Sequence, residues 1–410
     1  MNTPARWWAA GMIVLVALGQ AAWADAPVID LSDEDAQGAL QDSHRQQIDA
    51  FVAHYVDAMG KATTQETVVA ARRRLIDNYN RFGTRAQEYM AAFASSMAKH
   101  GKDGLAAATG AGRLDALKKI NLAIAASRMG QVSLGPLAEA MVSHNDPAVR
   151  FFGWDAYVSM RASVLAAGGP PADAMFAGLS DRLEKETDPH VLSQMMRMFT
   201  FRGVEEFGGA VSESAYEAGL ARFFKALQGN WVGLCQRMLR ADGVVAEAIS
   251  IATDAASKIK GELKEKVDDK ALAQMLANMA WSGGKAYDLA LTVYEAAKAK
   301  ADAAKLESGE AVESTTDPAQ KARELAKKAG MALEDLPSVT ESEHAVSAIA
   351  KALRDCEAAL NALTGAGKNL IEKELKNGGA AVRIGTLEWI DDVLVKKYGI
   401  KKPEEIISPK

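Results

Sequence analysis

Apolar side chains recur every three or four residues along most of the chain. This spacing places them on one face of a helix. Nowhere do apolar and polar residues alternate over a run rich in Val, Ile, Thr and aromatics, as they would in a half-buried strand. Segments such as 253–268 and 286–305 are rich in Ala, Lys, Glu and Leu, residues that lose little on entering a helix. The pattern therefore predicts an all-α fold.

The apolar pattern repeats when the region from residue 134 is laid over itself with an offset of 42 residues. The matched pairs are Leu134 and Phe176, Leu137 and Leu179, Met141 and Leu183, Asp146 and Asp188, Pro147 and Pro189, Val149 and Val191, Ala156 and Met198, and Tyr157 and Phe199. Each copy predicts a helix, a tight turn and a second helix, because Asp before Pro suits the start of a helix. One such hairpin cannot bury its apolar face alone, so we expect stacked copies to share a core.

These residues resemble the HEAT family of α-solenoid repeats. The resemblance is carried by Leu137, Met141 and residues 145–150 in one copy, and by Leu179, Leu183 and residues 188–191 in the next. It covers two clear units over 134–201, with a looser third at 216–239 and an earlier inner helix at 114–129. Where the family tends to place Arg after the Val, Arg150 matches and Leu192 does not. The resemblance implies an α-α superhelix that binds partners on one exposed face.

The first 24 residues predict an export signal. Arg6 precedes an apolar run at 7–18, and Ala22-Trp23-Ala24 follows. The run is about a dozen residues long, whereas a helix needs roughly 20 to cross a bilayer. We expect cleavage after Ala24, no membrane span in the mature chain, and a periplasmic or extracellular location. An uncleaved anchor is the alternative, because tryptophans flank the run and could lie at a membrane interface.

Composition shifts divide the rest of the chain. We expect N-terminal helices over 25–100, a glycine-rich flexible joint over 101–112, helical repeats over 110–242, long Ala/Lys/Glu-rich helices over 243–306, a polar linker over 307–316 and a C-terminal helical bundle or hairpin over 317–410. Within the last segment, Thr340 with Glu343 predicts a capping box. Gly365 and Gly399 predict helix ends.

Charge and cysteine content narrow the function classes. Loss of Arg6 with the signal would leave 47 basic and 53 acidic residues. A mildly acidic chain is not suited to coating phosphates, so we expect no nucleic-acid partner. Cys235 and Cys356 are the two cysteines. Export would permit a disulfide between them without requiring one.

The sequence contains no familiar catalytic signature. The six histidines are scattered, and none has a second His or a Cys at the spacing that puts two metal ligands on one helical face. No Gly-x-Ser-x-Gly is present. The stretch 365–369 looks like the end of a phosphate-binding loop, but Ala362 and Asn369 stand where such a loop needs Gly and Ser or Thr. We therefore predict no cofactor and no metal.

These observations favour a non-catalytic binding or scaffold protein of the bacterial periplasm or envelope, with a protein or peptide partner. Candidate partner-binding residues lie between the apolar positions of the repeats: Arg150, Trp154, Asp155, Arg161, His190 and Arg197. Trp154 with Arg150 is the sharpest candidate, since Trp and Arg often anchor interfaces. Trp154 packing on a neighbouring helix is the alternative interpretation. An envelope-acting hydrolase with a dispersed active site in a helical cleft, and a purely structural role, also stay open.

Overall fold

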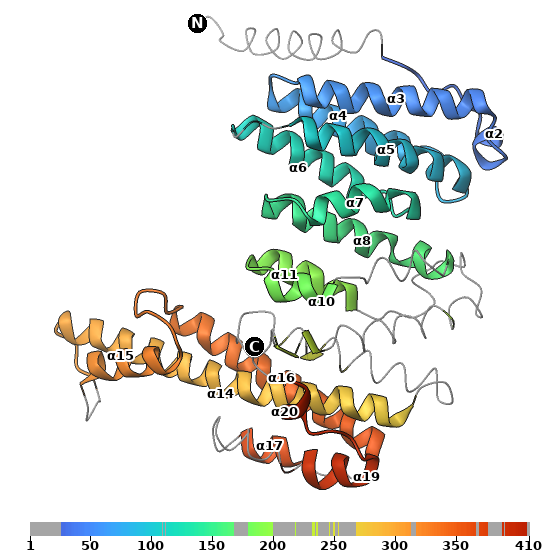
Figure 1. Ribbon diagram of the computed structural model, residues 1–410. Helices are drawn as coiled ribbons and strands as arrows, with labels where there is room; N and C mark the ends of the chain where they lie inside the picture. Colours follow the sequence, from blue (N-terminus) through green and yellow to red (C-terminus); the bar gives the residue numbers. More distant parts are fainter. Residues whose placement is uncertain are drawn as a thin grey trace, which may run out of the picture. The chain divides into compact units, whose positions relative to one another are not determined.

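The computed structural model of the chain describes residues 26–108, 110, 112–167, 179–199, 218, 232–233, 235–236, 246, 249–250, 253, 268–312, 317–365, 369–375, 388 and 390–407. The predicted export signal and most of the looser third repeat lie outside these residues. Every element assigned within them is helical, which confirms the all-α prediction (Figure 1). The chain divides into two compact units, Met1–Val164 and Leu165–Lys410, each described by itself below.

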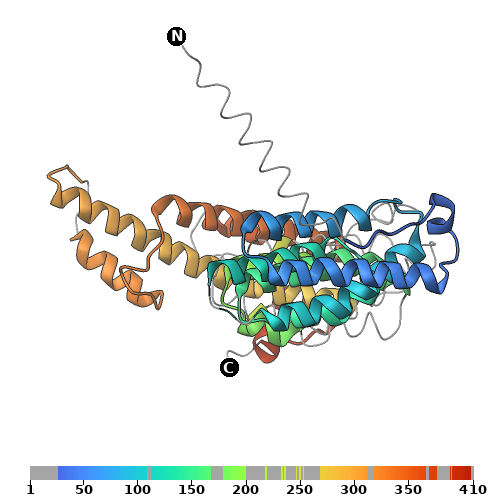
Figure 2. The ribbon, with the colours of Figure 1, turned by 90° about the horizontal axis from the view of Figure 1, so that it is seen from above.

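Unit 1 is built from helical hairpins. Its elements are α2 (Asp33–Gln37), α3 (Asp42–Lys61), α4 (Gln65–Tyr79), α5 (Gln87–Ala107), α6 (Arg113–Ser127), η1 (Val132–Leu134), α7 (Gly135–Val142) and α8 (Pro147–Ala167), whose last residues fall in unit 2. Helix α5 packs against α3 on one side and α7 on the other, while α4 packs against α6. Alternate helices thus form two rows, α3–α5–α7 and α4–α6, with nearly parallel axes (Figures 1 and 2).

Glycines let the helices of the first row approach closely. A Cβ on Gly101 would lie 2.7 Å from Leu137 Cδ2 of α7, and one on Gly104 would lie 2.8 Å from Val56 Cγ1 of α3. Both glycines are inside α5. The predicted flexible joint over 101–112 is therefore wrong for its first seven residues. These glycines serve interhelical contact, a role that a linear pattern does not distinguish from a break.

Aromatic side chains fill the core of the first two hairpins. Phe51, Tyr79, Tyr89 and Phe93 are all buried, and neighbouring rings lie 5.9 to 6.1 Å apart. The Tyr89 hydroxyl donates to the Asn78 carbonyl at 2.9 Å. Burial raises the pKa of Tyr79 to about 12, although Gln131 opposes this effect. The core is thus apolar, with its hydroxyl groups kept neutral.

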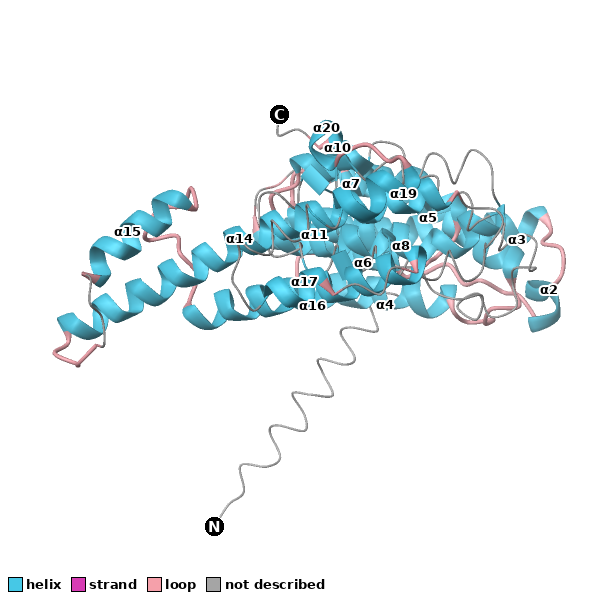
Figure 3. Cartoon of the chain, turned by 90° about the horizontal axis from the view of Figure 1, so that it is seen from below, coloured by secondary structure: helices cyan, strands magenta, loops and turns pink. Residues whose placement is uncertain are grey.

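Unit 2 contains one long helix, α14, that most of the C-terminal elements pack against. Its elements are α10 (Leu179–Lys185), α11 (Pro189–Met196), η2 (Arg197–Phe199), α14 (Asp269–Glu307), α15 (Pro318–Lys328), α16 (Val339–Thr364), α17 (Leu370–Leu375), the π-helical turn η4 (Ile390–Val395), α19 (Lys396–Tyr398) and α20 (Pro403–Ile406). Helix α15 lies along the second half of α14, around Ala296 and Ala326 (Figure 3). Helix α16 contacts the first half, where Leu353 meets Gly283.

The C-terminal segment is tied to the beginning of α14. Gln274 Nε2 donates to the Lys401 carbonyl at 2.9 Å, and its Oε1 accepts from the Lys401 amide at 2.8 Å. Trp281 Nε1 donates to Glu404 at 3.3 Å. A buried carboxylate, that of Glu357, accepts the amides of Ile371 and Glu372 at the start of α17. Side chains thus satisfy backbone groups that a helix end or an extended segment leaves open.

Most predicted helix ends agree with the structure, and two differ. Gly365 and Gly399 have φ of 68° and 60°, the left-handed conformation of a helix stop. The capping box before α16 uses Ser338 with Glu341, so the prediction of Thr340 with Glu343 was two residues late. Helix α14 extends to Glu307, one residue into the predicted linker.

Cys235 and Cys356 are both buried free thiols. The Cys235 Sγ lies 3.7 Å from the Met279 Sδ, and the Cys356 Sγ lies 3.8 Å from the Leu276 carbonyl oxygen. Burial raises the pKa of Cys356 to about 12. Both cysteines therefore act as small apolar side chains packed against one turn of α14.

Candidate functional site

The repeat positions predicted from the sequence share their environments. Leu137, Met141 and Val149 in the first copy are fully buried, as are their partners Leu179, Leu183 and Val191 in the second. The carboxylate of Asp146 accepts from the Ala148 amide at 2.9 Å, and that of Asp188 accepts from the His190 amide at 2.9 Å. Both aspartates are therefore caps, as expected. Phe176 and the side chain of Phe199 lie outside the described part of the chain.

Four predicted partner-binding residues lie on α8, and they do not form one surface. Trp154 is 1% exposed and its ring lies 5.6 Å from that of Tyr157, whose hydroxyl donates to Glu139 of α7. Arg161 is 4% exposed. Trp154 is therefore buried and is not an exposed anchor; the burial agrees with the alternative of a packing role. Asp155 is half-buried.

Arg150 has a local structural role that the sequence did not reveal. Its Nη1 donates to the carbonyl oxygens of His144 and Asn145, at 3.1 and 2.8 Å. These carbonyls belong to the turn between α7 and α8, so Arg150 ties the turn to the helix that follows. The other two candidates, His190 and Arg197, are exposed in unit 2, where Arg197 donates to Gln194 at 3.0 Å. Their role in partner binding stays a prediction.

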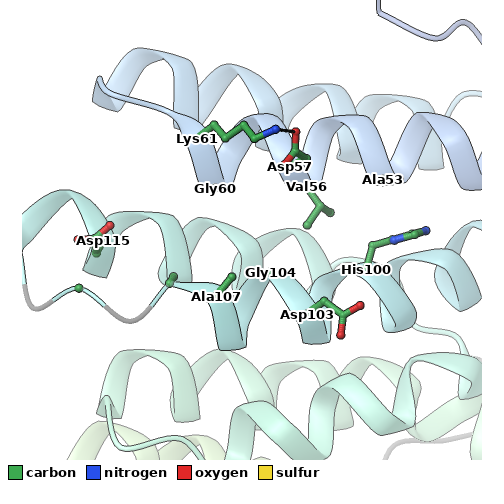
Figure 4. Close-up of a pocket in the computed structure, with 12 residues that line it drawn as sticks. Ala53, Val56, Asp57, Gly60, Lys61, His100, Asp103, Gly104, Ala107 and Asp115 are labelled. Atoms are coloured by element: carbon green, nitrogen blue, oxygen red, sulfur yellow. Dashed lines mark ion pairs between the residues drawn. The ribbon is translucent and has the colours of Figure 1, made fainter.

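A groove that the sequence did not predict runs between α3 and α5, with about 590 Å³ of open space. We call it the α3–α5 groove (Figure 4). It is lined by Ala53, Val56, Asp57, Gly60 and Lys61 of α3, His100, Asp103, Gly104 and Ala107 of α5, and Ala108, Gly110 and Asp115 beyond it. Its volume lies within the range of roughly 300–1,000 Å³ that is usual for ligand pockets.

Small residues make the groove. On α3, Ala53 and Gly60 face the same side because they are seven residues apart, and on α5 Gly104 and Ala107 share a side because they are three residues apart. Val56 packs closely against Gly104, where an added Cβ would lie 2.8 Å from its Cγ1. Beyond that contact the space widens, since a Cβ added to Gly60 would have nothing within 4 Å. The missing side chains thus leave the opening toward the carboxyl ends of both helices.

Three aspartates are among the lining residues of the groove. Asp57 pairs with Lys61 at 2.8 Å, and Asp115 pairs with Lys118 at 3.3 Å while its side chain reaches back over Gly110. Asp103 is exposed and has no hydrogen bond or ion pair with any described residue. Helices α3 and α5 run in the same direction here, so both end at the same side of the groove (Figure 4). Each helix end adds roughly half a negative charge.

His100 closes the other end of the groove. Its Nε2 lies 2.9 Å from Oδ1 of Asp49, and Lys99 Nζ lies 3.3 Å from Oδ2 of the same carboxylate. Burial acts to raise the pKa of Asp49, but the hydrogen bonds from His100 and Lys99 more than offset it and lower that pKa. Asp49 is therefore held as a carboxylate with its partners, and this cluster joins α3 to α5.

The arrangement can bind and position a ligand. Among the described residues, no three His, Cys, Asp or Glu side chains are grouped as metal ligands. Asp57 and Asp115 are paired with lysines, and the carboxylate of Asp103 points away from α3 (Figure 4). Gly60 and Gly104 each lie within a segment that otherwise favours a helix, and this was the signal that could have located the groove from the sequence.

Comparison with protein-family models, curated proteins and solved structures finds no match to this chain. In the part of the chain that the structure describes, no helix has the length and apolar character of a membrane span. Function has to be inferred from the residues themselves.

Proposed function

We propose that this chain is a non-catalytic binding or scaffold protein of the bacterial periplasm or envelope, which holds a protein or peptide partner on a surface of HEAT-like helical repeats. The observation that carries the proposal is the packing of alternate helices in unit 1, with α3, α5 and α7 in one row and α4 and α6 in the other. Stacked hairpins of this kind share a continuous core and leave an extended surface for binding.

The α3–α5 groove supports the same role. It lies between neighbouring hairpins, has the volume of a ligand pocket, and carries one carboxylate without a partner among the described residues. A cleft between stacked hairpins is suited to an extended segment or a protruding side chain of a partner.

Capture of a partner tests the proposal. The full chain, immobilised, would be incubated with bacterial envelope extract, alongside the variants Gly60→Leu and Asp77→Asn. A leucine at position 60 would extend into the open part of the groove, whereas Asp77 is an exposed residue of α4 outside the groove. We expect one stoichiometric protein partner that Gly60→Leu loses and Asp77→Asn retains. Turnover of a cell-wall fragment with no captured partner would instead favour the hydrolase.

Export is tested separately. If the signal is cleaved as expected, the amino-terminal residue of the protein recovered from the periplasm or culture medium is Asp25. A chain recovered with its first 24 residues in the membrane fraction would contradict the proposed location.

A further inference from the structure

Three sulfur-containing side chains lie close together in the buried core of unit 2. Cys235 Sγ is 3.7 Å from Met279 Sδ of α14, and both side chains are fully buried. Cys356 is also fully buried and lies on α16, which packs along α14 (Figure 1). Its Sγ is 3.8 Å from the carbonyl oxygen of Leu276, one turn before Met279. Burial raises the pKa of the Cys235 thiol, and the nearby Cys356 thiol adds to this rise. We call Cys235, Met279 and Cys356 the sulfur cluster.

Two hydroxyl groups beside the sulfur cluster lack hydrogen bonds. Ser282 lies beside Cys235, and Thr253 lies beside Cys356. Ser282 is fully buried and Thr253 is 6% exposed, yet neither oxygen has a hydrogen-bond partner among the described residues. A neutral thiol is a weak acceptor, whereas a thiolate accepts a hydrogen bond readily. Because buried polar groups are nearly always satisfied, these hydroxyls point to a state in which the neighbouring sulfurs are better acceptors.

The sulfur positions suit a shared metal ion. Two sulfurs that each bind one ion at about 2.3 Å lie roughly 3.7 to 4.0 Å apart in a tetrahedral or trigonal site. The separation of 3.7 Å between Cys235 and Met279 therefore needs little adjustment. Thiolate and thioether together select a soft ion such as Cu(I), whereas Zn²⁺ is bound by thiolate, imidazole and carboxylate. Among the described residues, no three His, Cys, Asp or Glu side chains are grouped to bind such a harder ion.

The apolar surroundings favour an ion with a single charge. A net charge in a buried apolar site is costly. When Cu(I) takes the place of the Cys235 thiol proton, one copper–sulfur bond forms and one proton is released, so the ion and its thiolate are neutral together. The copper stays Cu(I), and no electron is transferred. A divalent ion would reach neutrality only if both thiols lost their protons.

We propose that Cys235, Met279 and Cys356 form a buried site for a soft monovalent metal ion, Cu(I). Cys235 and Met279 bind the ion at close to their present separation, and Cys356 is the third ligand. The hydroxyls of Ser282 and Thr253 donate to the ligand sulfurs and so gain the acceptors that they lack. The site lies within unit 2 and does not depend on the proposed partner binding.

Competition with a chromophoric copper chelator tests the proposal. The full chain, with both thiols reduced, would be titrated with Cu(I) and bathocuproine disulfonate under argon, with ascorbate to keep the copper reduced. We expect one Cu(I) per chain to be withheld from the chelator, and X-ray absorption to show sulfur at about 2.3 Å from the copper. The unfolding midpoint should rise, because an ion that binds only the folded chain stabilises it. Zn²⁺ at the same concentration should leave the midpoint unchanged.

Three variants locate the ion. Cys235→Ala, Cys356→Ala and Met279→Leu each remove one ligand and keep an apolar side chain. Each is expected to weaken Cu(I) binding by at least about tenfold, the smaller loss seen for residues that only support a metal ligand. Met97→Leu makes the same exchange at a fully buried position of α5 and is expected to leave the affinity unchanged. Exchange of Met for Leu is well tolerated in cores, so this pair stays informative if a cysteine variant does not fold.

Several results would overturn the inference. One is transfer of all the Cu(I) to the chelator, and another is equal binding by Met279→Leu and Met97→Leu. Equal binding by Cys235→Ala and wild type would assign the copper to another part of the chain. A chain that is recovered from the periplasm or medium without free thiols after denaturation, and with a mass lower by two hydrogens, would show a disulfide in place of the metal site. None of these results changes the outcome of partner capture.

Discussion

Substitution of Gly104 by alanine should destabilise unit 1, whereas the same change at Gly60 should stabilise it. A Cβ at position 104 would lie 2.8 Å from Val56 Cγ1, while ordinary contacts begin at 3.4 Å. Val56 is buried, and its branched side chain has one strongly preferred rotamer in a helix, so it cannot turn away. A Cβ at position 60 would meet nothing within 4 Å.

The magnitudes follow from two effects. Replacing glycine by alanine inside a helix stabilises by about 0.5–1 kcal/mol. Both positions are helical with no positive φ, so both gain this contribution. Position 104 also incurs overpacking, which costs about 1–3 kcal/mol. The difference between the two variants cancels the helix contribution and isolates the overpacking, so we expect Gly104→Ala to be less stable than Gly60→Ala by about 1–3 kcal/mol.

Hydrogen exchange measured by mass spectrometry on peptides from α3 and α5 would check this locally, together with guanidinium unfolding of the full chain. A second substitution, Val56→Ala, removes the atom that the new Cβ would meet and should recover part of the loss in the Gly104→Ala background. If the amides of α3 and α5 exchange at the same rates in Gly104→Ala as in Gly60→Ala, the two helices are not in contact at this position and the reasoning fails.

Three further predictions concern the hairpins and their caps. Gly153→Ala should destabilise unit 1 by about 1–2 kcal/mol, measured by unfolding, because its Cβ would lie 2.7 Å from the Val142 amide nitrogen and the overpacking exceeds the helix gain; an unchanged midpoint would contradict the α7–α8 contact. Burial and the nearby Lys119 lower the pKa of His144, so stability should be full above pH about 6.5 and fall as the pH drops through the folded pKa; unfolding midpoints from pH 7.5 to 5 should show a fall that His144→Asn reduces. Asp188→Ala should cost about 1 kcal/mol through lost capping, seen as faster exchange in α11, while Asp188→Asn should keep most of that protection.

Helix class and capping were readable from the sequence because they depend on local spacing. The three- and four-residue periodicity reports which side of a helix is apolar, and Asp before Pro specifies a helix start through contacts of two or three residues. Asp146 and Asp188 therefore cap where expected. Ser338 in place of Thr340 shows the limit, since each of the two has a glutamate three residues later and both therefore satisfy the same sequence rule.

The candidate site was not readable in the same way. The α3–α5 groove needs the register between helices more than forty residues apart, and local periodicity carries no information on that register. Gly101 and Gly104 looked like the end of a helix. The sequence alone does not distinguish a glycine that lets a neighbouring helix approach from a glycine that ends a helix. Trp154 looked like a surface anchor because its place between apolar positions suggested exposure, yet its side chain is 1% exposed.

The burial of both cysteines has a practical consequence for labelling. A maleimide reacts with the thiolate, and burial in apolar surroundings suppresses that form in Cys235 and Cys356 alike. A cysteine engineered on the protein surface would thus be modified far faster than either native one. Dyes or spin labels could then be attached at chosen sites on a chain whose native cysteines are all kept.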